Sequence, residues 1–136
     1  MLPHWPAGTI AILATDDGTP HAIPVSAVVR GGDRRLLLAL AVRRGSLARL
    51  RERPAVAVAL IAPGVAFTAE GTARVIAQPL TDGTVAVEVA VDAIHDHDQP
   101  TFAIETGVGW RWTDDEAAAR DADVRTALAR LAAEPV

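Results

Sequence analysis

Short apolar runs separated by turn-forming residues occupy most of this chain of 136 residues. Seven runs are long enough for strands, and most are bounded by residues such as Gly, Pro and Asp that favour turns. They span residues 9–15, 21–30, 34–42, 55–62, 65–77, 84–94 and 101–112. Strands that follow one another this closely are typical of a small barrel, so we expect a mainly β fold of six to seven strands.

Four of these runs predict further detail of the sheet. Pro24 interrupts the second run, which indicates an edge strand or a bulge because proline cannot donate to a neighbouring strand. Residues 55–62 (AVAVALIA) are apolar on both faces, as expected of a central strand. Gly71 in the fifth run indicates a bulge or a close backbone approach. Residues 84–94 alternate regularly, which predicts that one side of that strand is buried.

The segment between the third and fourth runs, residues 43–54 (RRGSLARLRERP), combines a helical pattern with positive charge. It holds five of the thirteen arginines and one acid, although the whole chain has a net charge of −4. Ser46 is the expected N-cap, and Pro54 ends the helix because the residue before a proline disfavours helical geometry. A helix N-terminus with free N–H groups, a hydroxyl and guanidiniums suits a phosphate, and a solvated basic turn is the alternative.

A second helix is expected after the last run. Residues Thr113 to Glu116 have the pattern of a capping box, with Thr113 as the N-cap. The helix should reach about Ala133, because apolar residues recur at helical spacing. This apolar stripe consists of Ala117, Val124, Leu128 and Leu131.

Composition narrows the classes of function. The chain has no cysteine, which excludes disulfides and thiolate metal sites. Its mild acidity argues against nonspecific nucleic-acid binding, which depends on broad positive surfaces. Residues 1–6 lack the features of a signal peptide, and no run approaches the roughly 20 apolar residues of a membrane span. We therefore expect one soluble, cytoplasmic domain over residues 1–136, with neither nucleic acid nor membrane as a partner.

Three motifs, in this order, resemble the FMN-binding split-barrel family, the group similar to pyridoxamine 5′-phosphate oxidase and to the deazaflavin-dependent reductases. They are DGTPHAIPV at residues 17–25, the basic helix that ends in LRERP at 50–54, and EGTA at 70–73. The resemblance covers roughly residues 9–112. The expected fold is therefore a six- to seven-stranded split β-barrel, with a short helix after the third strand and a C-terminal helix.

The resemblance implies a homodimeric oxidoreductase that holds FMN, or a deazaflavin, at the subunit interface and acts on a small molecule. The implied phosphate contacts are Arg43, Arg44, Ser46 and Arg49. The residues implied beside the cofactor ring are Ile23, Pro24, Val25 and Ser26. Those implied to reach the cofactor from the partner subunit are Trp110, Arg111 and Trp112. The cofactor carries out the difficult chemistry in such proteins, so we assign no catalytic residue.

Other interpretations stay open. A protein of this fold can serve without a cofactor as a dimeric binding or structural module. His95 and His97 share one face if their strand continues, which suits a metal, but this polar cluster is also typical of an exposed turn. We assign no metal ligand. Trp110 and Trp112 are either an aromatic wall beside a ligand or core residues near the last helix.

Overall fold

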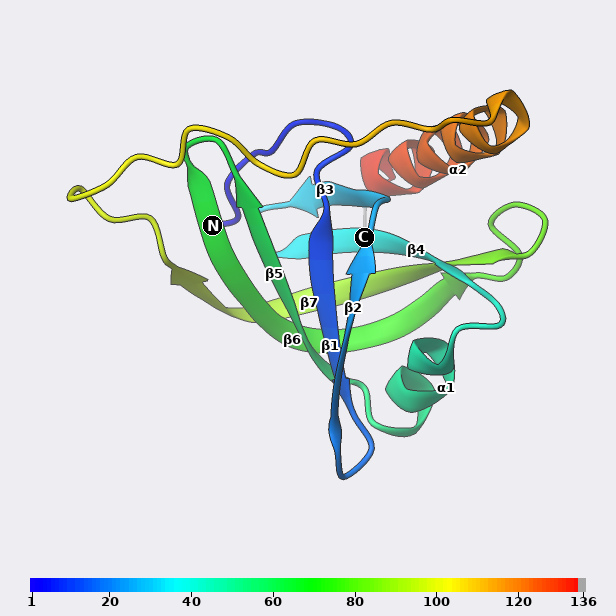
Figure 1. Cartoon of the computed structure of the whole chain (residues 1–136). Coiled ribbons are helices and arrows are strands. Elements are labelled where there is room, and N and C mark those ends of the chain that lie inside the picture. Colours follow the sequence, from blue (N-terminus) through cyan, green and yellow to red (C-terminus); the bar gives the residue numbers. More distant parts are fainter. Residues whose placement is uncertain (135–136) are drawn as a thin grey trace.

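The computed structural model describes residues 1–134 and contains one seven-stranded antiparallel sheet and two helices. The sheet curls strongly on itself, and the helices lie in different parts of the molecule (Figure 1). The strands are β1 (Ala11–Asp16), β2 (Pro20–Val25), β3 (Val28–Gly32), β4 (Arg35–Ala41), β5 (Ala55–Ala62), β6 (Val65–Ala77) and β7 (Thr84–Asp96). The helices are α1 (Gly45–Glu52) and α2 (Asp115–Ala133). Neither is long and apolar enough to cross a membrane.

The two edges of the sheet are brought close together by the chain itself. The strand order is β2-β1-β5-β6-β7-β4-β3, so β2 and β3 are the edge strands although they follow each other in sequence. The backbone N–H of Ala39 in β4 donates to the carbonyl of Ala27, between the edge strands, at 3.2 Å. Because β2 and β4 are near each other but form no ladder, the curled sheet closes only in part.

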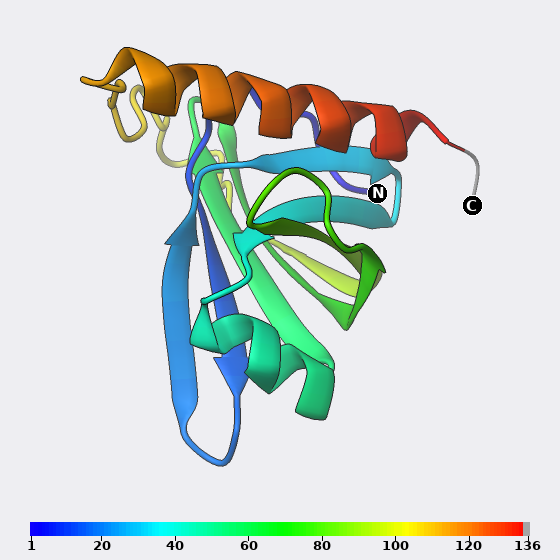
Figure 2. The same cartoon turned by 90° about the vertical axis from the view of Figure 1, so that its right-hand side faces the viewer.

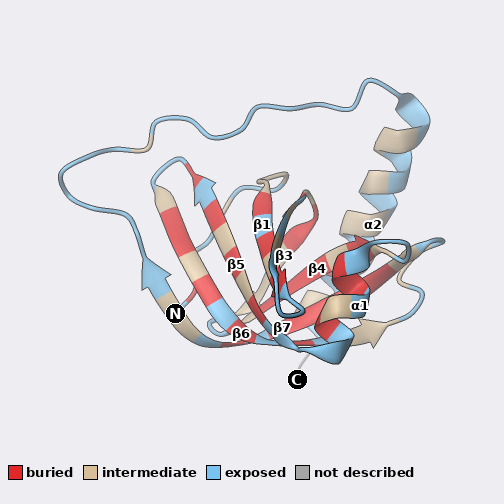
Figure 3. Cartoon of the chain, turned by 60° about the horizontal axis from the view of Figure 1, so that its bottom comes forward, coloured by how far each residue is buried: buried red, intermediate tan, exposed pale blue. Residues whose placement is uncertain are grey.

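An aliphatic core fills the inside of the curled sheet. Alternate residues of the strands point inward, as the colouring of β1, β5 and β6 shows (Figure 3). Leu47 and Leu50 of α1 join this core, and the ring of Trp5 packs on Phe67 at 5.6 Å between centroids. The fully buried side chains include Leu13, Leu36, Leu38, Val58, Leu60, Phe67, Val85 and Val87.

Helix α2 covers the outer side of β3 and β4 (Figure 2). Leu128 is fully buried in a second apolar cluster with Leu37 and Ala86. This cover corrects one prediction, because the first half of β7 is buried on both sides and not on one. The alternation of residues 84–94 identified the inner face, but it did not show that another element lies on the outer one.

A charge network around the buried carboxylate of Glu88 joins α2 to the sheet. The Glu88 carboxylate accepts hydrogen bonds from Nε of Arg35 at 2.7 Å and from Nε of Arg74 at 2.9 Å. Arg35 also donates to the carbonyls of Leu131 and Ala132, at 3.5 and 3.4 Å, in the last turn of α2. Burial disfavours the charged form of Glu88, but the hydrogen bonds from the two arginines outweigh burial and lower its pKa.

Several sequence predictions are confirmed. Pro24 lies in an edge strand, and β5 is central between β1 and β6. The pairing of β6 with β7 shifts register between Glu70 and Gly71. A Cβ atom on Gly71 would lie 2.1 Å from the carbonyl oxygen of Ala90, so the β7 backbone leaves room only for glycine.

Residues 101–112 form no strand, which corrects the prediction for the seventh run. This segment connects β7 to α2 as irregular backbone along one side of the molecule, and nearly all of it is exposed (Figure 1). This run has no partner strand within residues 1–134. A strand satisfies its backbone N–H and C=O groups by pairing, so a run without a neighbour does not form one. The seventh strand arises because run 21–30 is divided into β2 and β3.

Both predicted helix caps are displaced. The N-cap of α1 is Arg44, which makes no side-chain cap hydrogen bond, and Ser46 lies within the first turn. The N-cap of α2 is Asp114, whose carboxylate accepts from the N–H of Ala117 at 2.8 Å. Asp is at least as good a cap as Thr113, so the helix begins one residue later than the capping-box pattern predicted.

Candidate functional site

A small hollow lies where β2 and β4 face each other without pairing, and we call it the edge groove. It has a volume of about 120 Å³. Its lining contains all four residues predicted to lie beside a cofactor ring and one predicted phosphate contact. The lining residues are Ile23, Pro24, Val25, Ser26, Ala39, Leu40, Ala41 and Arg44.

The walls of the edge groove are strand edges that keep free backbone groups. Within residues 1–134, β2 pairs only with β1, and β4 beyond Leu38 pairs as a ladder only with β7. In the same range, the one additional backbone bond at this edge runs from the N–H of Ala39 to the carbonyl of Ala27. Backbone N–H and C=O groups that face a groove can bind the polar edge of a planar heterocycle. Pro24 has no N–H, so its position offers only an acceptor.

Two free arginines stand where β4 passes into α1. Arg44 lines the edge groove and Arg43 precedes it. Both are exposed, and neither forms an ion pair within the described residues 1–134. Guanidiniums that no acid neutralises are suited to phosphate oxygens, which they can hold by two parallel hydrogen bonds.

The other two predicted phosphate contacts are engaged within the fold. Ser46 is only 1% exposed, and its Oγ lies 3.5 Å from Nη2 of Arg49. Nε of Arg49 also donates to the hydroxyl of buried Thr15 in β1 at 3.2 Å. These contacts hold α1 against β1. Neither side chain lines the edge groove.

The turn between β1 and β2 places a carboxylate near this helix. The N–H of Thr19 at 3.2 Å and the ring of His21 at 3.1 Å hold the pKa of the Asp17 carboxyl below its usual value. Arg49 contributes to the same shift by its charge. Among the four predicted phosphate contacts, Arg43 and Arg44 are therefore the cations that the described residues leave accessible, since Arg49 is engaged by Thr15 and Ser46.

The comparisons with known proteins bear on the fold. No family model and no curated protein matches the chain. A pyridoxamine 5′-phosphate oxidase-like protein of Listeria innocua matches at TM-score 0.56 and 15% identity, over 67% of this chain and 90% of that one. An F420 reductase matches at TM-score 0.56 and 17% identity, over 65% of this chain and 90% of that one. A FAD-binding protein of Mesorhizobium loti matches at TM-score 0.54 and 13% identity, over 65% of this chain and 84% of that one. The chain has the split-barrel fold.

At these identities the likeness shows the fold alone. In this split barrel the split is the unpaired boundary between β2 and β4, and the edge groove is its opening. The fold therefore accounts for the strand edges that line the groove, whereas the side chains in it are particular to this chain.

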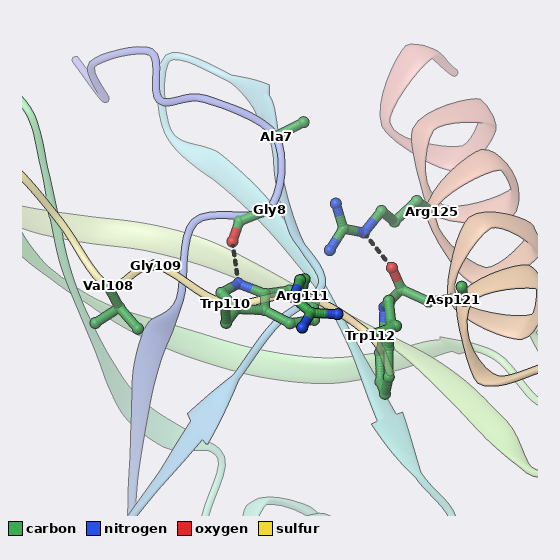
Figure 4. Close-up of a pocket in the computed structure, with 10 residues that line it drawn as sticks. Ala7, Gly8, Val108, Gly109, Trp110, Arg111, Trp112, Asp121 and Arg125 are labelled. Atoms are coloured by element: carbon green, nitrogen blue, oxygen red, sulfur yellow. Dashed lines mark hydrogen bonds and ion pairs between the residues drawn. The ribbon is translucent and has the colours of Figure 1, made fainter. Parts of the chain in front are cut away.

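The split barrel has a larger cavity beside α2, which we call the tryptophan groove (Figure 4). Its volume is about 560 Å³, and its lining includes Trp110, Arg111, Trp112, Asp121 and Arg125. The two indoles meet edge to face at 5.3 Å between centroids. The carbonyl of Gly8 accepts from Nε1 of Trp110 at 2.9 Å. Residues 110–112 thus contact the N-terminal segment and α2 of their own chain, and a contact with a partner's cofactor stays a prediction.

His95 and His97 lie on the outer side of the β6–β7 pair. Nε2 of His95 contacts the Glu70 carboxylate, and Nε2 of His97 lies 2.8 Å from the hydroxyl of Thr68. Both imidazoles are exposed. Residues 1–134 contain no group of three or more His, Cys, Asp or Glu side chains arranged to hold a metal ion.

The sequence did not predict the hydrogen bond from Arg49 to the Thr15 hydroxyl, nor the charge network around Glu88. These contacts join residues 34 and 53 positions apart, and no local pattern marks them. It also missed the pair of Asp121 and Arg125, which their helical i, i+4 spacing could have indicated.

Proposed function

We propose that this protein is a homodimeric oxidoreductase that binds a flavin-type cofactor, FMN or a deazaflavin, in the edge groove. The observation that carries the proposal is the meeting of two unpaired strand edges with a free guanidinium, that of Arg44, at their end. The fold supports it, since an F420 reductase and a FAD-binding protein share this fold.

The residues present fit such a group in two respects. The backbone of Ile23 to Ser26 offers hydrogen-bonding groups to a ring edge, and Arg43 and Arg44 offer charge to a phosphate. When bound, a flavin-type cofactor supplies the hydride or electron transfer. The chain would bind the cofactor, orient its ring and limit the access of water. Ser46 and Arg49 would act indirectly, by fixing the start of α1.

The edge groove of one chain is too small for a whole cofactor. Its volume of about 120 Å³ lies below the roughly 300–1,000 Å³ of sites for small molecules. A second subunit placed over the opening would supply the missing walls. This is a reason to expect that the site is completed in a dimer.

An uncovered apolar sheet face supports the dimer. The outward residues of β2, β1 and β5 lie opposite one another in the strand register. Asp16 at the end of β1 is charged, whereas the other outward residues are apolar and at least partly exposed; they include Ala22, Pro24, Ile12, Ala14, Ala57, Ala59 and Ile61. Such a face is typically covered by a second copy in two-fold dimers. Pro24 belongs both to this face and to the edge groove, so a partner on the face would reach the groove.

Substituting Arg44 by glutamine should weaken FMN binding about 10- to 100-fold, because a charge-assisted contact to the phosphate is lost. Binding is measured by the quenching of flavin fluorescence during titration with the protein. Riboflavin lacks the phosphate, so its affinity should not change in the same variant.

The matched control for this prediction is Arg53→Gln, which removes an exposed arginine at the far end of α1. It should leave the affinity for FMN unchanged. If both variants weakened FMN binding equally, the effect would come from the overall positive charge of this region and not from a specific contact of Arg44. If neither FMN nor a deazaflavin binds the parent protein, the proposal fails and the cofactor-free binding module becomes the better interpretation.

The substitution Ile12→Glu should convert the dimer into a monomer at micromolar concentration. Ile12 is 40% exposed on the apolar face, and a two-fold interface would bury the new charge twice. Sedimentation velocity measures the change, and we expect the dissociation constant to rise by about 100-fold or more. Val42→Glu is the control, since Val42 is 50% exposed but lies outside this face. A monomeric parent would contradict the dimer, and a dimeric Ile12→Glu variant would contradict the choice of face.

A further inference from the structure

We propose that the tryptophan groove binds a planar aromatic carboxylate within one subunit, separately from the edge groove. The two sites share no lining residue. A volume of about 560 Å³ lies within the range of sites for small molecules and admits a compound of one or two rings. This assignment gives residues 110–112 a role in their own chain, in place of one toward a partner's cofactor.

The aromatic part of the ligand class follows from the two indoles. Trp110 and Trp112 remain 36% and 43% exposed although they are the largest apolar side chains of the segment. The bond from Trp110 to Gly8 fixes one ring, and the edge-to-face contact fixes the other against it. Two tryptophans held in this way at a cavity wall present a rigid surface on which a flat ring can stack.

The anionic part follows from the way Arg125 is held. Its Nε lies 2.8 Å from Oδ2 of Asp121, yet this buried N–H has no well-directed hydrogen-bond acceptor within residues 1–134. The rest of the guanidinium points from α2 into the space between Gly8 and the tryptophans (Figure 4). The Arg125 side chain is 29% exposed, so the side of the guanidinium that faces away from Asp121 is accessible to a carboxylate.

The charges that line the groove favour an anion over a cation. Arg111 and Arg125 face a single acid, Asp121, which leaves one positive charge in excess. The Arg125 guanidinium already lies 5.6 Å from the centre of the Trp110 ring, so this ring is occupied as a receptor for cations. A ligand with its carboxylate at Arg125 and its ring on the exposed surface of Trp112 would contact both the guanidinium and the accessible indole.

Isothermal titration of the purified protein with 2-naphthoate tests this inference, with 2-naphthalenemethanol as the neutral probe of equal shape. We expect 2-naphthoate to bind with a dissociation constant of about 1 mM or lower and the alcohol to bind at least about tenfold more weakly. Absence of heat with 2-naphthoate, or equal affinity for the alcohol, would overturn the proposal.

Variants identify the contacts. Arg125→Gln and Trp112→Leu should each raise the dissociation constant for 2-naphthoate about tenfold or more. Arg111→Gln provides a further test, because Arg111 is exposed and forms no ion pair with any residue of 1–134, so the folding of this variant does not depend on such a pair. Arg120→Gln is the control on α2, outside the groove, and should bind as the parent does. Parent-like affinity in both Arg125→Gln and Trp112→Leu would place the ligand elsewhere.

A second titration in the presence of excess FMN separates this inference from the proposed function. The affinity for 2-naphthoate should not change, whether or not FMN binds. Displacement of 2-naphthoate by FMN would overturn the separate site and assign the tryptophans to the cofactor instead.

Discussion

Replacing Gly71 with alanine should lower the free energy of unfolding by about 3 kcal/mol or more. The added methyl group would lie 2.1 Å from the carbonyl oxygen of Ala90 and 2.9 Å from its carbonyl carbon. These atoms belong to the backbone of β7, so relief requires β6 and β7 to move apart at the centre of the sheet. Thermal denaturation should show a melting temperature about 10 °C below that of the parent.

Gly109→Ala is the matched control. A Cβ atom at Gly109 meets nothing within 4 Å, and its backbone does not require glycine. We expect the control to stay within about 0.5 kcal/mol of the parent. A Gly71→Ala protein with a parent-like melting temperature would show that the two strands separate without cost and that the bulge is not a tight contact.

The substitution Glu88→Gln should cost about 3 kcal/mol of stability at neutral pH. The side chains of Glu88 and Arg35 are only 7% and 13% exposed, so the variant leaves a nearly buried guanidinium without its counter-charge. Glutamine keeps the shape of the side chain, and the loss therefore reports charge and hydrogen bonding and not packing. Because Arg35 also holds the end of α2, amide hydrogen exchange should quicken in the last turn of that helix.

The pH dependence gives the Glu88 prediction a second measurement. The pKa of Glu88 is lowered in the folded protein relative to its ordinary value of 4.5. Its contribution is therefore present in full above that ordinary value and is lost as the pH falls through the lowered one. The stability difference between parent and Glu88→Gln should be constant near neutral pH and shrink below about pH 4.5. Glu116→Gln is the control, since its ion pair with Arg120 is exposed and should contribute below about 0.5 kcal/mol.

The strands of the barrel were predictable because each carries its own local signal. Alternation, turn residues and the prolines at positions 24 and 54 were enough to predict six runs that overlap all the observed strands, and to predict helix α1 between β4 and β5. The prediction of a strand failed at residues 101–112, which have no partner strand within residues 1–134. Periodicity reports which side of a strand would face the core, whereas a partner for its backbone depends on where the rest of the chain lies.

The candidate site was predictable only in part. The resemblance to a known family placed Ile23 to Ser26 beside Arg44, and the structure brings them to one groove. It could not show that Ser46 is buried, or that Arg49 is engaged by Thr15 from another strand. These facts depend on how α1 docks on β1. The groove around Trp110 was equally hidden, because Gly8 and Arg125 are remote from it in sequence.

The proline in β2 has a consequence for the solubility of the protein. An edge strand with a complete row of free N–H and C=O groups is a template on which strands of other molecules can add. Pro24, the last residue but one of β2, has no N–H to offer, so a strand added along β2 would meet its pyrrolidine ring and no donor at that position. The same residue can therefore leave the groove open to a small ligand while it resists growth of the sheet from one molecule to the next.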